Sequence, residues 1–263
     1  MYTSIIIYRN LYFNTIFYFT ITAPSLLLEK ALVCVVGNAQ KQVAKLFGYT
    51  DVLEFEQKEI DEMIQAVIYK NAPDCYIAHQ DRPYVVYLHR ALYKKCIPLE
   101  TIYKCGIFGL PQETESVKPS QWDEYSFDYD IQKGKTAVIA PYAKSVAALP
   151  EKIWKDLIAD LKSNGYKVFT NVIGDEKPLA GTGGISPKIS EMKSAVEQAG
   201  LFIGIRSGMC DVIRTAECRK IALYPDYFYC DTQWKSIDMY AIDGFENIVV
   251  KDGDTWNELK LRM

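Results

Sequence analysis

Two patterns of apolar and polar residues alternate along this chain. Short apolar runs are followed by longer stretches in which apolar residues recur at every third or fourth position. Short apolar runs are typical of buried strands, and the longer period is typical of helices that cover a sheet. Strand and helix therefore alternate, which predicts parallel sheets with helices on both faces.

In the first half, strands are expected at residues 4–8, 32–36, 51–55 and 74–78. Helices are expected at residues 16–30, 39–47, 60–68 and 83–95, and Pro83 suits a first helical position. Residues 109–126 contain Pro111, Pro119 and several acids, a composition typical of a linker. The pattern predicts two domains, residues 1–126 and 127–263.

The second half repeats the pattern more clearly. Strands are expected at residues 136–140, 167–173, 201–205, 220–224 and 247–250. A helix is expected at 150–164, where one apolar stripe comprises Ile153, Trp154, Leu157, Ile158 and Leu161. A glycine-rich loop is expected at 174–184. A further helix should begin near Ser186 or Ser190 and end at Gly200. Either serine could cap its N-terminus. A short helix is expected at 209–217. The predicted fold class is α/β, with two Rossmann-like domains and parallel sheets.

Composition narrows the function. The formal charge of -3 and the pI near 5.6 argue against a protein that neutralises many phosphates of a nucleic acid. The seven cysteines form no Cys-x-x-Cys pair and no cluster with the two histidines. We therefore expect reduced, buried thiols in a cytoplasmic protein, and no structural metal.

Residues 11–28 carry no charge but are interrupted by polar residues and Pro24. They fit neither a signal peptide nor a spanning helix well. A buried strand-helix unit is the favoured interpretation, with peripheral membrane contact as the alternative.

Ligands of open parallel sheets bind beyond the carboxyl ends of the strands. Three predicted loops at such ends carry polar residues, namely Lys144 and Ser145, then Asp175 and Glu176, then Arg206, Ser207, Gly208 and Asp211. A Ser-Gly turn that opens a helix offers backbone N–H groups to a diphosphate, and an arginine fork suits phosphate. In the alternative interpretation, Ser207 caps the helix, Arg206 forms a surface ion pair, Lys144 is a solvated loop residue and the acids form turns. Cys210 has no histidine partner in view, so a nucleophilic role is not expected.

Residues 136–226 resemble the donor-binding half of GT-B glycosyltransferases, particularly the heptosyltransferase-like family (family 9). The matching segments read APYAKSVAALPEKIW, YKVFTNVIGDE, ISEMKSAVEQAGLFIGIRSGMCDVI and KIALYP. The segment AGLFIGIRSGMCD is also similar to the donor site of fucosyltransferases that use GDP-fucose. The resemblance implies two Rossmann-like domains that face a cleft, donor binding mainly by the second, and transfer without a metal ion. It implies no cofactor beyond the nucleotide-diphosphate sugar, which is the substrate.

The chain departs from that family at two places. Met209, Cys210 and Asp211 stand where heptosyltransferases usually carry Pro-Met-His, and residues 9–15 contain no acid that could serve as the base. The segment from His79 to Tyr84 lies between a predicted strand and helix, so His79 and Asp81 are the candidate catalytic residues and Arg82 a candidate acceptor or anion contact. In the alternative interpretation, Asp81 caps the helix and His79 is a turn residue.

The leading hypothesis is a cytoplasmic glycosyltransferase of polysaccharide biosynthesis that moves a sugar from a nucleotide-diphosphate donor to a glycan or lipid-linked acceptor. A second hypothesis is a non-catalytic or truncated relative that binds a nucleotide sugar or a partner transferase, which the missing acid favours. A third is an epimerase of sugar nucleotides, but no Gly-x-Gly-x-x-Gly follows the first strand.

Overall fold

The computed structural model describes residues 4–7, 31–71, 75–77, 97, 101, 104–105, 110–115, 118–128, 130–144, 146–228 and 235–262. The chain divides into two compact units, Met1–Trp122 and Asp123–Met263, where the sequence predicted a boundary between residues 126 and 127. The described residues of the predicted linker, 110–115 and 118–126, form no helix or strand.

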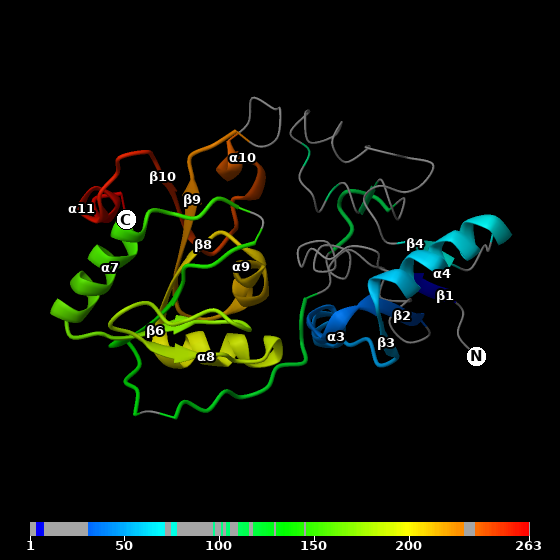
Figure 1. Ribbon diagram of the computed structural model, residues 1–263, viewed down its shortest axis with the longest axis horizontal. Coiled ribbons are helices and arrows are strands. Elements are labelled where there is room, and N and C mark those ends of the chain that lie inside the picture. Colours follow the sequence, from blue (N-terminus) through cyan, green and yellow to red (C-terminus); the bar gives the residue numbers. More distant parts are fainter. Residues whose placement is uncertain are drawn as a thin grey trace. The chain divides into compact units, whose positions relative to one another are not determined.

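The first unit contains a parallel sheet whose strands lie in the order β3-β2-β1-β4. The strands are β1 (Ser4–Ile7), β2 (Ala31–Val36), β3 (Val52–Phe55) and β4 (Cys75–Ile77), close to the predicted ranges. Helix α3 (Gly37–Leu46) connects β2 to β3, and α4 (Gln57–Lys70) follows β3 (Figure 1). The predicted helices at 16–30 and 83–95 lie outside the described residues.

Alternate residues of β2 face different helices, as expected of a strand buried on both sides. Cys34 packs with Ile60 and Ile64 of α4. Its neighbours Val33 and Val35 are fully buried, as are Val43 and Ala44 of α3. The apolar period in the sequence therefore corresponds to the buried faces of these helices.

The second unit contains a six-stranded parallel sheet in the order β10-β9-β8-β5-β6-β7. Its strands are β5 (Thr136–Ala140), β6 (Lys167–Asn171), β7 (Gly183–Ile185), β8 (Gly200–Ile205), β9 (Arg219–Pro225) and β10 (Glu246–Val250). Counted from β5, this is the strand order 3-2-1-4-5-6 of dinucleotide-binding Rossmann sheets. The predicted fold class is confirmed.

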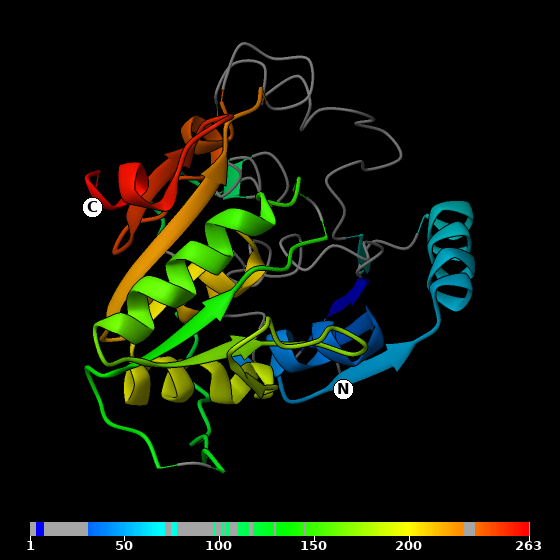
Figure 2. The ribbon, with the colours of Figure 1, turned by 60° about the vertical axis from the view of Figure 1, so that its left-hand side comes forward.

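Helices cover both faces of this sheet (Figures 1 and 2). On one face, α7 (Glu151–Ser163) buries the predicted stripe against the apolar residues of the strands, and α11 (Trp256–Lys260) packs beside it. Helix α8 (Met192–Ala199) contacts β5 and β8 and is followed directly by β8. The chain runs from β8 into α9 (Gly208–Val212) and a 3-10 turn (Ile213–Thr215) before β9.

Two predictions for the second unit are wrong, and two short helices were missed. Strand β7 begins inside the segment 174–184 that was expected to be a loop, and it was missed because its two glycines carry no apolar pattern. They permit close packing instead, since a Cβ on Gly183 would lie 2.8 Å from the ring of Phe169. Neither Ser186 nor Ser190 is an N-cap, since Lys188 precedes the 3-10 turn Ile189–Glu191, and Glu191 precedes α8. The short helices α10 (Ser236–Tyr240) and α11 were not predicted.

The cysteines follow the expectation only in part. Cys34 and Cys210 are buried free thiols, whereas Cys75 and Cys218 are half-buried and Cys105 is exposed. Burial was inferred from neighbouring apolar residues in the sequence, which do not determine the exposure of a side chain by themselves.

Candidate functional site

The second sheet has a topological switch point between β5 and β8. These strands are neighbours, with Ala140 paired to Gly204 at the carboxyl edge. From β5 the chain continues through α7 to β6 on one side, and from β8 it continues through α9 to β9 on the other. Such a divergence leaves a crevice beyond the strand ends, where open α/β sheets bind ligands. The structure therefore brings the loops that carry Lys144 and Ser207 to the same edge of the sheet.

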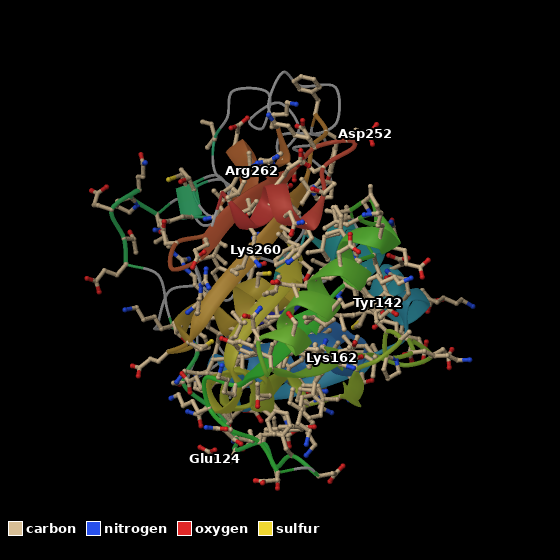
Figure 3. All side chains as sticks on the ribbon, turned by 90° about the vertical axis from the view of Figure 1, so that its left-hand side faces the viewer. Glu124, Tyr142, Lys162, Asp252, Lys260 and Arg262 are labelled. Atoms are coloured by element: carbon tan, nitrogen blue, oxygen red, sulfur yellow. The ribbon has the colours of Figure 1, made fainter. Side chains whose placement is uncertain are left out.

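The loop after β5 is fastened to the loop after β6. Pro141 is buried, and the hydroxyl group of Tyr142 donates a hydrogen bond of 2.7 Å to the carbonyl oxygen of Lys177 (Figure 3 labels Tyr142). Lys144 is exposed and forms no ion pair with any residue that the structure describes. Its ammonium group is thus available to a ligand, whereas Ser145 lies outside the described residues.

The two acids after β6 have different surroundings. Glu176 closes its own turn, because its Oε2 accepts a 2.9 Å hydrogen bond from the backbone N–H of Ile173. Gly174 has a φ of 63°, which allows the tight turn. Asp175 is exposed at the tip. Of the two, Asp175 is therefore the one whose carboxylate is turned to solvent.

The Arg206 side chain is directed into the protein. Arg206 and Asp211 are only 5% and 2% exposed, and Nη2 and Nη1 of Arg206 donate hydrogen bonds of 2.7 and 2.9 Å to the two carboxylate oxygens of Asp211. Further contacts reach backbone carbonyl oxygens of Tyr240, at 2.9 Å from Nε, and of Ser207, at 2.7 Å from Nη1. The ion pair of the alternative interpretation is present, but it is buried and not on the surface. A direct contact of either side chain with a donor stays a prediction.

The turn after β8 exposes part of its backbone. Ser207 is the N-cap residue of α9 and has extended backbone angles, but its side chain makes no capping hydrogen bond. Its carbonyl oxygen accepts a 3.0 Å hydrogen bond from the N–H of Cys210. Within the described part of the chain, the N–H groups of Gly208 and Met209 donate no hydrogen bond. They remain available for an acceptor from outside.

Cys210 is unsuited to act as a nucleophile. Its Sγ is fully buried and lies 3.7 Å from the carbonyl oxygen of Ile205. Burial raises the pKa of the thiol to about 11, so the reactive thiolate is disfavoured at neutral pH.

The candidate catalytic residues of the first unit, His79 and Asp81, lie outside the described residues, as does Arg82. Their roles stay predictions. Among the residues that are described, no group of His, Cys, Asp and Glu is arranged to hold a metal ion. Within the same ranges, every helix is too short or too polar to cross a membrane.

Three contributors to this edge were missed by sequence reasoning. Tyr142 stood in the quoted loop but received no role, and the carbonyl oxygen of Tyr240 comes from a helix that was not predicted. Asn171, the last residue of β6, is 6% exposed, and its buried Oδ1 accepts no hydrogen bond from any residue that the structure describes. A polar residue that ends an apolar strand was the available signal for Asn171, whereas no local signal identifies the Tyr240 carbonyl.

Comparison with known proteins identifies the fold. No family model and no curated protein matches the chain. Among solved structures, the E. coli heptosyltransferase WaaC with ADP-2-deoxy-2-fluoro heptose aligns over 98% of this chain and 98% of that one, with a TM-score of 0.56 and 11% identity. The E. coli ADP-heptose LPS heptosyltransferase II aligns over 94% and 90%, with a TM-score of 0.57 and 12% identity.

Other similar structures belong to the same class. The glycosyl transferase of family 9 from Veillonella parvula aligns over 99% of this chain and 89% of that one, with a TM-score of 0.53 and 13% identity. The chain spans 58% of the length of the dodecameric iron-containing glycosyltransferase TibC from enterotoxigenic E. coli, with a TM-score of 0.54. These similarities establish the fold: the chain has the architecture of GT-B, heptosyltransferase-like glycosyltransferases.

Proposed function

We propose that this protein is a cytoplasmic glycosyltransferase that binds a nucleotide-diphosphate sugar at the carboxyl edge of the second sheet. The observation that carries the proposal is the switch point between β5 and β8, because the loops that carry Lys144 and the Ser207–Gly208 turn follow these two neighbouring strands. A cation and unsatisfied backbone N–H groups at one sheet edge suit a diphosphate. The similar structures support the donor class, because WaaC was solved with ADP and with an ADP-heptose analogue.

In the proposed reaction, an acceptor hydroxyl attacks the anomeric carbon of the donor sugar and the nucleoside diphosphate leaves. Lys144 and the N–H groups of Gly208 and Met209 would stabilise the negative charge that develops on the leaving group, without a metal ion. Ser145, Ser207 and Asp175 would bind donor hydroxyl groups or phosphate oxygens. His79 or Asp81 would accept the proton of the acceptor, and Arg82 would contact the acceptor or an anionic group.

The acceptor would be a glycan or a lipid-linked sugar, as in polysaccharide biosynthesis. A lipid-linked acceptor would bring the protein to a membrane surface, which agrees with the proposed peripheral contact of residues 11–28. These steps rest on the sequence patterns and on the shared fold.

Titration calorimetry tests donor binding. ADP, GDP and UDP, together with their sugar conjugates, would be titrated into the intact protein and into Lys144→Ala. We expect one nucleotide type to bind, and Lys144→Ala to weaken its binding about tenfold through the loss of a charge-assisted contact. Lys155→Ala is the matched control, because Lys155 is an exposed lysine of α7 and lies outside the proposed site. Absence of binding for every nucleotide would exclude the proposal.

A second candidate is a non-catalytic protein that binds the same donor and associates with a partner transferase. It is favoured by the absence of an acidic residue from positions 9–15. The two functions differ in turnover. Release of nucleoside diphosphate on addition of a panel of glycan and lipid-linked acceptors supports the transferase, and tight binding without release supports the second candidate.

A further inference from the structure

Two opposite charges are buried together beside the proposed donor site. Arg206 follows β8 directly and Asp211 lies on α9, and the two form a bidentate ion pair with both side chains almost inaccessible to solvent. Removal of one partner of such a pair leaves an uncompensated buried charge. The buried pair therefore strongly constrains the conformation of the turn after β8.

The guanidinium group also connects segments that are distant in the sequence. Its Nη1 donates to the carbonyl oxygen of Ser207, which the N–H of Cys210 also reaches. Its Nε donates to the carbonyl oxygen of Tyr240 at the end of α10. That same oxygen accepts a 2.8 Å hydrogen bond from the hydroxyl group of Tyr224 in β9. The Arg206 side chain thus ties the turn after β8 to α9 and α10, and Tyr224 ties β9 to the same carbonyl oxygen.

These contacts engage most of the guanidinium group. One N–H on Nε, two on Nη1 and one on Nη2 donate within the protein, which is at least four of its five N–H groups. A direct contact with a diphosphate would require some of these bonds to break and would separate Arg206 from its buried counter-charge. The geometry disfavours that exchange.

We infer that Arg206 and Asp211 are positioning residues, which rests on the proposed donor site at this edge. The pair holds the Ser207–Gly208 turn in the conformation that presents backbone N–H groups, and the diphosphate contacts the turn and Lys144 but not the guanidinium group. The pair has no net charge, so its contribution to donor binding is conformational.

Substitution of Asp211 separates the two possible roles. If Arg206 contacted the diphosphate, Asp211→Asn would release the guanidinium group from its partner and tighten nucleotide binding. If the pair positions the turn, Asp211→Asn weakens binding, and we expect a loss of about tenfold or more in the calorimetric Kd. Arg206→Met should give a similar loss, and Arg206→Met/Asp211→Leu should bind no worse than either single variant, because the interaction is shared.

Further variants control for charge. Arg206→Lys keeps the positive charge but lacks the planar fork, so it should not restore binding. Arg219→Met removes a cation that pairs with Glu246 at the amino end of β9, the opposite edge of the sheet, and should bind like the intact protein. Tighter binding by Asp211→Asn, or full binding by Arg206→Lys, would overturn the inference.

Hydrogen exchange tests the same inference without a ligand. Backbone amides of residues 207–212 should exchange faster in Arg206→Met and in Asp211→Asn than in the intact protein, whereas those of β5 should be unchanged. Unchanged exchange at 207–212 would overturn the positioning role. If the intact protein binds no nucleotide, the proposed function fails, and the exchange result still decides whether the pair orders the turn.

Discussion

Gly200 joins a helix to an interior strand of the second sheet. It is the C-cap of α8 with a φ of 93°, and a Cβ at this position would lie 2.7 Å from the backbone nitrogen of Gly134. Gly200→Ala therefore combines an unfavourable left-handed backbone with a backbone clash. We expect it to lower the free energy of unfolding by about 2–4 kcal/mol in urea denaturation.

Gly174→Ala is the matched control for this prediction. Gly174 has a φ of 63°, but no atom lies within 4 Å of a Cβ placed there. Its replacement should cost only the backbone term, about 1 kcal/mol. Equal losses for the two variants would show that the contact with Gly134 contributes nothing.

The buried thiol of Cys210 provides a second test at the scale of one residue. With a pKa of about 11 and no accessible surface, Cys210 should resist iodoacetamide at neutral pH, whereas the exposed Cys105 should react. Mass spectrometry of the alkylated peptides measures both sites in one sample. Rapid modification of Cys210 in the native protein would contradict its burial.

Helix α11 is held to the rest of the second unit by buried apolar residues and by contacts of two carboxylates. Asp160 of α7 accepts hydrogen bonds from Nζ of Lys260 at 2.6 Å and from the indole N–H of Trp256 at 3.1 Å (Figure 3 labels Lys260). Asp254, just before α11, forms a bidentate pair with Arg262. Because α11 has only five residues, these contacts and the burial of Trp256 and Leu259 are what stabilise it.

These carboxylates make the docking of α11 sensitive to acid. Burial acts to raise the pKa of Asp160, but hydrogen bonds from Lys260 and Trp256 outweigh burial, so that the pKa is lowered. The hydrogen bond from Arg262 lowers the pKa of Asp254. Groups with lowered folded pKa values stabilise the protein above the ordinary Asp value of about 3.9, and that contribution is lost as pH falls through the folded values.

The acid effect can be measured with Asp160→Asn/Asp254→Asn. We expect the intact protein to exceed this variant in unfolding free energy at about pH 6, and the difference to shrink towards about pH 3. Urea denaturation of both proteins across this range provides the comparison. A difference that does not change with pH would show that neither carboxylate has a lower pKa in the folded protein than in the unfolded chain.

At the scale of the whole molecule, the second unit has the features of an independent domain. Its six-stranded sheet has helices on both faces. Residues that precede β5 pack onto this unit: the N–H of Tyr125 donates a hydrogen bond of 3.1 Å to Oγ of Ser194, and the ring centroids of Phe127 and Phe169 lie 5.3 Å apart. Its apolar core lies within the unit.

We therefore expect residues 123–263 to fold when produced alone. Circular dichroism on heating should show one cooperative transition, and the fragment should bind the donor nucleotide within about tenfold of the intact protein, because the proposed nucleotide contacts lie in this unit. A matched fragment that begins at residue 130 should be less stable, because it lacks Tyr125 and Phe127. A fragment 123–263 that shows no cooperative transition would contradict the independence of the unit.

Local periodicity in the sequence was sufficient to predict most elements and the fold class. The stripe from Ile153 to Leu161 predicted α7, and the run Thr136 to Ala140 predicted β5, because burial against a sheet selects apolar residues at fixed intervals. Strand β7 was missed because glycines carry no such interval, and the caps near Ser186 were misassigned because a cap depends on where the chain turns.

The sequence determines which loops form the candidate site, but it does not determine the direction of every side chain in them. The rule that ligands bind beyond parallel strand ends identified the loops that carry Lys144 and Ser207, because strand direction follows from the alternation of strand and helix. Whether Arg206 is directed to solvent or into the protein depends on Asp211 and on the carbonyl oxygen of Tyr240, 34 residues further along the chain. Only the tertiary structure decides this, because folding brings that oxygen to the guanidinium group.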